Sequence, residues 1–145
     1  MPNYPHGGDI WNYPTPPLDF SSNLHPLGMP PAVAEAARGA VDRANAYPDP
    51  FCRALREAIA RREGVEPGQV VCGAGAADLI FRLCLALKPR QALVTAPTFS
   101  EYEQALRLFG CAVRRFPLLP EEGFVLPERF PEALAPGLDL LFLCT

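Results

Sequence analysis

The sequence predicts an α/β fold with a largely parallel sheet, flanking helices and an extended amino-terminal arm. Residues 1–29 are rich in proline, glycine and aromatic residues and lack helical periodicity, although residues 18–20 could form a short strand. Two amphipathic helices are predicted within residues 30–68, and short apolar segments then alternate with helical ones over residues 69–145. Such alternation is typical of a parallel sheet covered by helices. With 145 residues, 49% of them hydrophobic, the chain can bury one core.

The first predicted helix begins at Pro30 and Pro31, because proline suits the first helical turn. Its apolar residues recur on one face: Val33, Ala36, Ala37, Ala40 and Val41. The second helix follows a turn, with Asp49 as its N-cap, Pro50 as its first residue and Gly64 as its C-cap. These residues mark the start of the first helix and both ends of the second.

The alternating half of the chain contains four predicted strands and three predicted helices. The strands are at 69–72, 92–95, 112–116 and 138–144, and the helices are at 76–87, 98–109 and 127–134. The helix over 76–87 is apolar almost all round, which predicts burial on most of its sides. Thr98 and Glu101 have the spacing of a capping box at the start of the next helix.

Charge and cysteine usage exclude several classes of protein. The net charge is −3, so we expect no nucleic-acid partner, and no apolar run approaches the length of a membrane span. The start of the chain lacks the pattern of a secretory signal, so we expect a cytoplasmic protein. The cysteine count is odd and no C-x-x-C spacing occurs, so we expect neither a metal site nor disulfides. All five cysteines are predicted to be small buried residues: Cys52, Cys72, Cys84, Cys111 and Cys144.

A glycine-rich loop at residues 73–78 lies between a predicted strand and a predicted helix. Its glycines let the backbone approach a ligand, and the first N–H groups of the following helix favour an anion such as phosphate. A dinucleotide site is set aside, because Asp78 stands where glycine or alanine is needed and no acid ends the strand at Ala96. A tight turn without a ligand remains the alternative.

Six segments together resemble the pyridoxal-phosphate-dependent class I and II aminotransferases of fold type I. Within them the order and spacing are similar to the threonine-phosphate decarboxylases of cobalamin biosynthesis, which are close relatives of histidinol-phosphate aminotransferases. The segments are His6-Gly7-Gly8, residues 19–28, Tyr47-Pro48-Asp49, and residues 73–80, 96–102 and 141–145. The resemblance implies a small-domain part at residues 30–68 and a truncated cofactor-binding large domain at residues 69–145.

The resemblance implies pyridoxal 5′-phosphate as the cofactor. The backbone of Gly75, Ala76 and Ala77 would hold its phosphate, in agreement with the anion argument. Phe99 would stack on the pyridine ring, and a core phenylalanine is the alternative. Tyr47 would reach the cofactor phosphate of the partner subunit in a homodimer, and a turn tyrosine packed on the second helix is the alternative.

The resemblance also assigns residues to a small phosphorylated amino-acid substrate. Asn23 and Gly28 would belong to a loop that closes over the substrate. His6 and Asn23 would help to hold the substrate phosphate, whereas a solvated histidine is the alternative for His6. The resemblance assigns no role to His25.

No catalytic residue is expected in this chain. The cofactor chemistry of the family needs a lysine, and the one lysine present, Lys88, follows the helix over 76–87. It is therefore one helix length, about 18 Å, from the glycine loop. We expect the chain to be the amino-terminal part of a longer enzyme and to be inactive by itself.

The expected activity is decarboxylation of L-threonine O-3-phosphate to aminopropanol phosphate. Transamination of histidinol phosphate is the alternative enzymatic function, because both substrates carry an amine and a phosphate. A non-catalytic fragment or dimerisation module is the alternative of another class.

Overall fold

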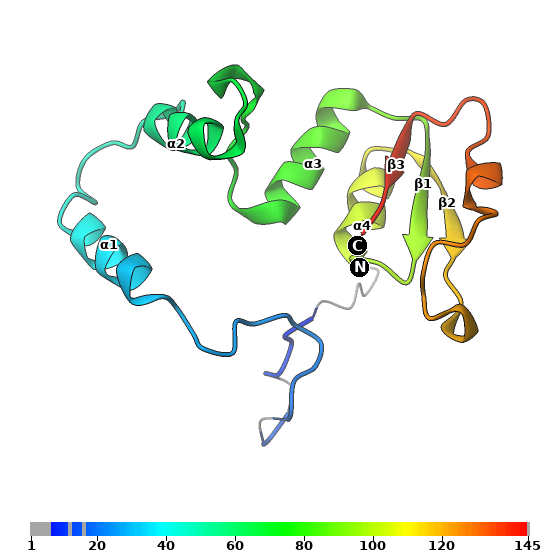
Figure 1. The fold of residues 1–145 in the computed structure, drawn as a ribbon, viewed down its shortest axis with the longest axis horizontal. Helices are drawn as coiled ribbons and strands as arrows, with labels where there is room; N and C mark the ends of the chain where they lie inside the picture. Colours follow the sequence, from blue (N-terminus) through cyan, green and yellow to red (C-terminus); the bar gives the residue numbers. More distant parts are fainter. Residues whose placement is uncertain (1–6, 12, 16, 145) are drawn as a thin grey trace. The chain divides into compact units, whose positions relative to one another are not determined.

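The computed structural model describes residues 7–11, 13–15 and 17–144. The chain divides between Cys72 and Gly73 into two compact units, which are described separately below. Figure 1 labels the helices and strands of both units. The α/β fold with a parallel sheet and flanking helices is confirmed.

The unit before Gly73 contains both predicted amphipathic helices. Helix α1 spans Pro31–Val41, helix α2 spans Arg53–Glu63, and the 3₁₀ helix η1 spans Pro67–Gln69. The prediction that α2 starts at Pro50 was wrong, because Cys52 takes a left-handed backbone conformation with φ 49° and delays the helix. Asp49 nevertheless acts as a cap, since its carboxylate accepts the backbone N–H of Arg53 at 2.8 Å.

The described part of the arm, up to Met29, contains no helix or strand. The short strand that the sequence allowed at residues 18–20 is therefore wrong, since no neighbouring strand pairs with it among the described residues. A turn replaces it: the Asp19 carboxylate accepts the hydroxyls of Ser21 and Ser22, both at 2.6 Å. The Ser21 hydroxyl also accepts the N–H of Gly8 at 2.9 Å and so joins two parts of the arm.

The unit from Gly73 onward is built on a three-stranded parallel sheet. Strand β1 (Gln91–Ala96) lies between β2 (Ala112–Pro117) and β3 (Leu140–Phe142). Helices α3 (Gly75–Leu87) and α4 (Ser100–Leu108) precede and follow β1. The 3₁₀ helices η2 (Pro120–Glu122) and η3 (Phe130–Ala133) lie between β2 and β3.

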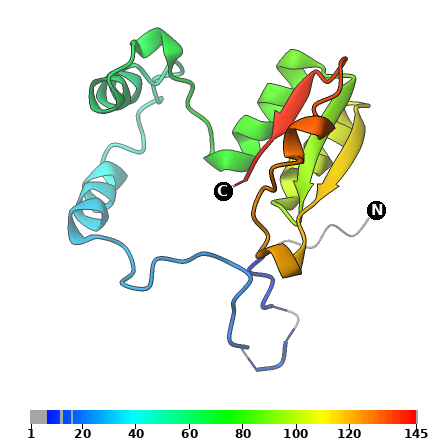
Figure 2. The ribbon, with the colours of Figure 1, turned by 45° about the vertical axis from the view of Figure 1, so that its right-hand side comes forward.

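Both faces of β1 are covered (Figure 2). Helices α3 and α4 share one apolar cluster with one face of β1, made of Ile80, Cys84, Ala92, Val94, Ala105, Leu106 and Cys111. On the other face η3 packs through Phe130, whose ring meets the Phe116 ring edge-on at 5.0 Å. Phe116 is the register partner of Thr95, so Phe130 lies on the Thr95 side of the sheet.

Two predicted strands differ from the structure. The segment at residues 69–72 is not a strand, because Val70 has an extended backbone but no strand among the described residues pairs with it. Strand β3 is limited to three residues instead of the predicted 138–144, since it pairs with β1 only at Ala92, Leu93 and Val94. The helix predicted at 127–134 is the shorter 3₁₀ helix η3.

Helix α3 is less buried than its apolar sequence predicts. Only Ile80 and Cys84 are fully buried, and three leucines on its other sides are 42 to 56% exposed: Leu83, Leu85 and Leu87. The prediction of burial on most sides was wrong, because within this unit only one face of the helix packs on the sheet.

The capping box predicted at Thr98 is also wrong. Helix α4 begins one residue later than Thr98 would allow, with Phe99 as its N-cap, and no side chain caps it. The Thr98 hydroxyl has no hydrogen-bond partner among the described residues. Glu101 turns inward instead, is 7% exposed and accepts the Ser100 hydroxyl at 2.9 Å.

The cysteines are only partly the buried residues that the sequence predicts. Cys84 and Cys111 are buried, and burial raises the pKa of both thiols. Cys52 and Cys72 are half-buried, and Cys144 is exposed because it lies beyond the paired part of β3. All five are free thiols.

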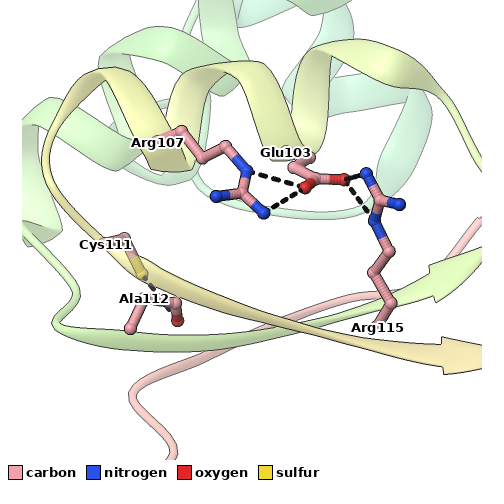
Figure 3. A network of polar contacts seen from close by, with 5 residues as sticks. All are labelled: Glu103, Arg107, Cys111, Ala112 and Arg115. Carbon is pink, nitrogen blue, oxygen red and sulfur yellow. Dashed lines mark hydrogen bonds and ion pairs between the residues drawn. The ribbon is translucent and has the colours of Figure 1, made fainter.

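Glu103 joins helix α4 to strand β2 (Figure 3). One carboxylate oxygen accepts Nε of Arg107 at 2.7 Å, and the other accepts Nε of Arg115 at 2.8 Å. The Glu103 side chain is only 13% exposed. Burial alone would raise the pKa of Glu103, but the hydrogen bonds from Arg115 and Arg107 outweigh it and lower the pKa.

Asp139 fixes the start of β3 against the start of β1. One oxygen of its carboxylate accepts the backbone N–H groups of Arg90 at 2.7 Å and Gln91 at 3.0 Å. The N–H of Asp139 donates in turn to the carbonyl of Gln91 at 2.9 Å. The two hydrogen bonds to the carboxylate, first that from Gln91 and then that from Arg90, lower the pKa of Asp139.

We expect Glu103→Ala to lower the free energy of unfolding by about 2 kcal/mol, because it removes charge-assisted bonds and leaves two arginines without their partner. Glu121→Ala, an exposed change in the same unit, should cost less than about 0.5 kcal/mol. Urea unfolding measures both variants. Equal stability losses would mean that Glu103 does not join helix to strand.

Asp139 should stabilise the fold in a pH-dependent way. Its pKa is lower in the folded state, so its contribution is complete above the unfolded carboxyl pKa of about 4 and is lost as pH falls through the folded pKa. Asp139→Asn keeps an acceptor but loses the charge. We expect this variant to melt below the parent at pH 7 and the difference to shrink below pH of about 4. A difference that grows on acidification would contradict this assignment.

Candidate functional site

The glycine loop has a conformation that two of its glycines make possible. A Cβ atom on Gly73 would lie 2.7 Å from Oδ2 of Asp78 and 2.7 Å from Cδ2 of Leu79, so a side chain there would displace both of these residues. Gly75 has φ +87°, in the left-handed region that glycine adopts without strain. The loop therefore turns sharply into α3 at the position that the sequence predicts.

Asp78 closes the loop onto its own helix. Its Oδ2 accepts the N–H of Ala74 at 2.9 Å, and its Oδ1 accepts Nε of Arg82 at 2.9 Å. The Ala74 N–H chiefly, together with Arg82, lowers the pKa of Asp78. The carboxylate is thus ionised and paired, and Arg82 offsets its repulsion of an anion at the start of α3.

The first-turn N–H groups of Gly75, Ala76 and Ala77 form an anion-binding surface. Helix geometry gives these groups no acceptor within α3, and the helix dipole adds a partial positive charge there. Ala76 is exposed and Ala77 half-buried, so small side chains leave the surface accessible. These are the three positions that the family resemblance assigns to the cofactor phosphate.

The glycine loop and Phe99 lie at the same edge of the sheet. Helix α3 is joined to β1 by only Lys88–Arg90 and shares its apolar cluster, so the two run in opposite directions. Thirteen helical residues and six strand residues each span about 20 Å. The start of α3 therefore lies at the carboxyl end of β1, where ligands gather in open α/β sheets.

Lys88 lies at the opposite end of α3, as predicted. It is the C-cap of the helix, with φ 48°, and is exposed. A whole helix length separates it from the first-turn N–H groups. Lys88 therefore belongs to the far edge of the sheet and has no part in the site.

Phe99 follows the carboxyl end of β1 and is 36% exposed. Its ring meets the Tyr102 ring edge-on, with centroids 5.7 Å apart and planes at 81°. A fully buried core phenylalanine, the alternative from sequence, does not describe it. The exposed part of the ring can stack on a flat ligand.

A hollow of about 290 Å³ adjoins Phe99 at this edge. It is lined by Val94, Thr95, Ala96, Pro97, Thr98, Phe99, Ser100, Glu103 and Arg115. The hydroxyls of Thr95 and Thr98 are buried without a hydrogen-bond partner among the described residues. The sequence pattern assigned neither hydroxyl to the site. Their position at the carboxyl end of a predicted buried strand could have indicated it.

The remaining assigned residues belong to the other compact unit. Asn23 and Gly28 are exposed, and Gly28 forms a turn with φ +72° in which its N–H donates to the carbonyl of His25 at 2.9 Å. Tyr47 is 92% exposed, so the alternative of a tyrosine packed on α2 is wrong. His6 lies outside the described residues.

The residues present fit pyridoxal phosphate. One edge of the sheet provides three helical N–H groups for a phosphate and an exposed aromatic ring for a pyridine. Groups of metal-ligating side chains do not occur in the part of the chain that the structure describes. Among the same residues, no helix is long and apolar enough to cross a membrane.

Comparison with known proteins identifies the family. A threonine-phosphate decarboxylase of Salmonella typhimurium is 40% identical over 150 residues, which span 99% of this chain and 41% of the relative. A histidinol-phosphate aminotransferase of Lactiplantibacillus plantarum is 33% identical over 128 residues, which span 86% of this chain and 36% of the relative. The chain thus spans about two fifths or less of the relatives that it matches.

The solved structures confirm the fold. A double mutant of Thermus thermophilus aspartate aminotransferase matches with a TM-score of 0.69 and 32% identity, covering 78% of this chain and 32% of that one. The family described as aminotransferase class I and II matches residues 15–130. It is a family of pyridoxal-phosphate-dependent enzymes, as the resemblance implied. This chain therefore belongs to the aminotransferase class I and II family.

Proposed function

We propose that the protein that carries this chain binds pyridoxal 5′-phosphate and decarboxylates L-threonine O-3-phosphate to aminopropanol phosphate. The observation that carries the cofactor is that the first turn of α3 and Phe99 both lie at the carboxyl edge of the sheet. The similarity to the threonine-phosphate decarboxylase, which extends over 99% of this chain, supports the substrate.

In this proposal, each residue of the sheet edge has a defined task. The N–H groups of Gly75, Ala76 and Ala77 hold the cofactor phosphate, and Phe99 covers one face of the pyridine ring. The bound cofactor supplies a sink for the electrons that the departing carbon dioxide leaves behind. The described residues thus bind and orient the cofactor, while the lysine that the chemistry requires is not Lys88.

The other unit would supply groups for the substrate and for a partner subunit. His6 and Asn23 would hold the substrate phosphate, and Gly28 would allow the turn of the loop that closes over it. The exposed Tyr47 hydroxyl is free to reach the cofactor phosphate of a partner in a homodimer. We place this enzyme in the cytoplasm.

Transamination of histidinol phosphate is the second candidate, because the histidinol-phosphate aminotransferase shares 33% identity with this chain. A dimerisation module is the third, and the exposed leucines of α3 favour it. The two enzymatic reactions differ in one requirement that can be tested directly. Transamination needs a keto-acid acceptor, whereas decarboxylation does not.

We expect the protein at its native length to release carbon dioxide from L-threonine O-3-phosphate without any keto acid. A coupled assay for carbon dioxide measures the first reaction. The control replaces the substrate with histidinol phosphate plus 2-oxoglutarate and follows glutamate formation. Glutamate formation without carbon dioxide release would favour the aminotransferase, and neither product would favour the dimerisation module.

Gly75→Ala should weaken phosphate binding beyond its effect on stability. A Cβ meets no atom within 4 Å at Gly75 or at Gly110, and both have positive φ, at +87° and +77°. Both alanine variants should therefore lose about 1 kcal/mol of stability through backbone strain. Only Gly75→Ala should also raise the dissociation constant of pyridoxal phosphate, by about fivefold, because it displaces the first-turn N–H groups.

Equilibrium dialysis of pyridoxal phosphate and thermal melting measure these two effects for both variants. Gly110→Ala is the matched control, since it introduces the same strain beyond the end of α4. If both variants weaken binding equally, the glycine loop does not hold the phosphate.

A further inference from the structure

Three aromatic rings form a continuous contact from β1 to β3. The Tyr102 ring on α4 meets Phe99 edge-on at 5.7 Å and stacks on Phe142 of β3 at 4.5 Å, with planes 13° apart. Aromatic pairs prefer these two geometries, and each contributes beyond the apolar area that it buries. Phe99, which follows β1, is therefore connected to β3 through a single side chain.

Tyr102 is held from more than one side. It is half-buried and packs against the apolar cluster shared by α3, α4 and β1, as Phe142 does. Burial raises the pKa of Tyr102, and contact of its hydroxyl with Cys144 adds to the shift. The ring of Tyr102 is thus fixed by the core below, by Phe142 at its face and by Cys144 at its hydroxyl.

Phe99 is the more exposed ring of this pair. It lies at the N-cap of α4, outside the regular helix, and is 36% exposed. A T-shaped pair covers at most one face of a ring, so Tyr102 contacts the Phe99 ring without enclosing it. The edge-on contact with Tyr102 therefore constrains the plane of the Phe99 ring.

We infer that Tyr102 is a positioning residue that fixes the plane of the Phe99 ring, and with it the angle at which a bound pyridine ring stacks. This inference rests on the proposed function, since it needs pyridoxal phosphate at Phe99. Tyr102 packs on the core of the unit, and its contacts with Phe99 and Phe142 give it this second role.

Three variants of the protein at its native length test the inference. Tyr102→Leu removes both aromatic contacts, whereas Tyr102→Phe keeps the rings and removes only the hydroxyl. Phe109→Leu is the matched control, because Phe109 packs on the same cluster at the opposite end of α4. The readouts are the dissociation constant of pyridoxal phosphate and the circular dichroism induced in its visible absorption band, which depends on ring orientation.

We expect Tyr102→Leu to raise the dissociation constant about three- to tenfold and to change the induced circular dichroism of the cofactor that remains bound. Tyr102→Phe should stay within about twofold of the parent protein. Phe109→Leu should lower the melting temperature without altering either readout.

The outcomes separate this inference from the proposed function. If the parent protein binds no pyridoxal phosphate, the proposed function fails and the inference fails with it. If the parent binds but Tyr102→Leu and Phe109→Leu behave alike, Tyr102 only stabilises the core and the inference alone is overturned. Should Tyr102→Leu not fold, Phe142→Leu removes the support of Tyr102 and leaves Phe99 in place. An unchanged induced circular dichroism in Phe142→Leu would then overturn the inference.

Discussion

Burial of the central strand is the constraint on which the rest of this α/β unit depends. Four successive residues of β1, from Ala92 to Thr95, are at most 2% exposed, so both faces of the strand need a cover. Helices α3 and α4 supply one cover and the η3 segment the other. Because only Lys88–Arg90 joins α3 to β1, the helix runs antiparallel to the strand that it covers, and its first turn reaches the carboxyl edge of the sheet. The position of the site is thus a consequence of how one strand is buried.

Local pattern was sufficient for most elements of the fold. Helical spacing located α1, α2, α3 and α4, and apolar segments located β1 and β2. The errors concern properties that depend on distant residues. A strand at 69–72 needs a pairing partner, and burial of Leu85 on α3 needs a neighbour on that side. Neither the pairing partner nor the packing neighbour can be predicted from the spacing of apolar residues within one segment.

The candidate site was predictable to the same extent. The turn at Gly75 and the position of Phe99 follow from local sequence, because both stand at ends of regular elements. The sequence could not show which hydrogen-bond partners the polar side chains of the site find. Asp78 bonds Ala74 behind it, Glu103 reaches across to Arg115, and the Thr95 hydroxyl remains without a partner. These contacts depend on the packing of α3 and α4 against particular strands.

The order of the strands has a consequence for synthesis on the ribosome. Strand β1 leaves the ribosome before both of its neighbours, and β3 follows it by more than forty residues. During that interval one edge of β1, the most buried strand, has its N–H and C=O groups unpaired, and such an edge can pair with other chains. Asp139, the residue before β3, bonds the backbone N–H groups of Arg90 and Gln91 at the start of β1 and so fixes the register of the two strands. This edge therefore stays exposed in a nascent chain until β3 has emerged from the ribosome and paired with β1.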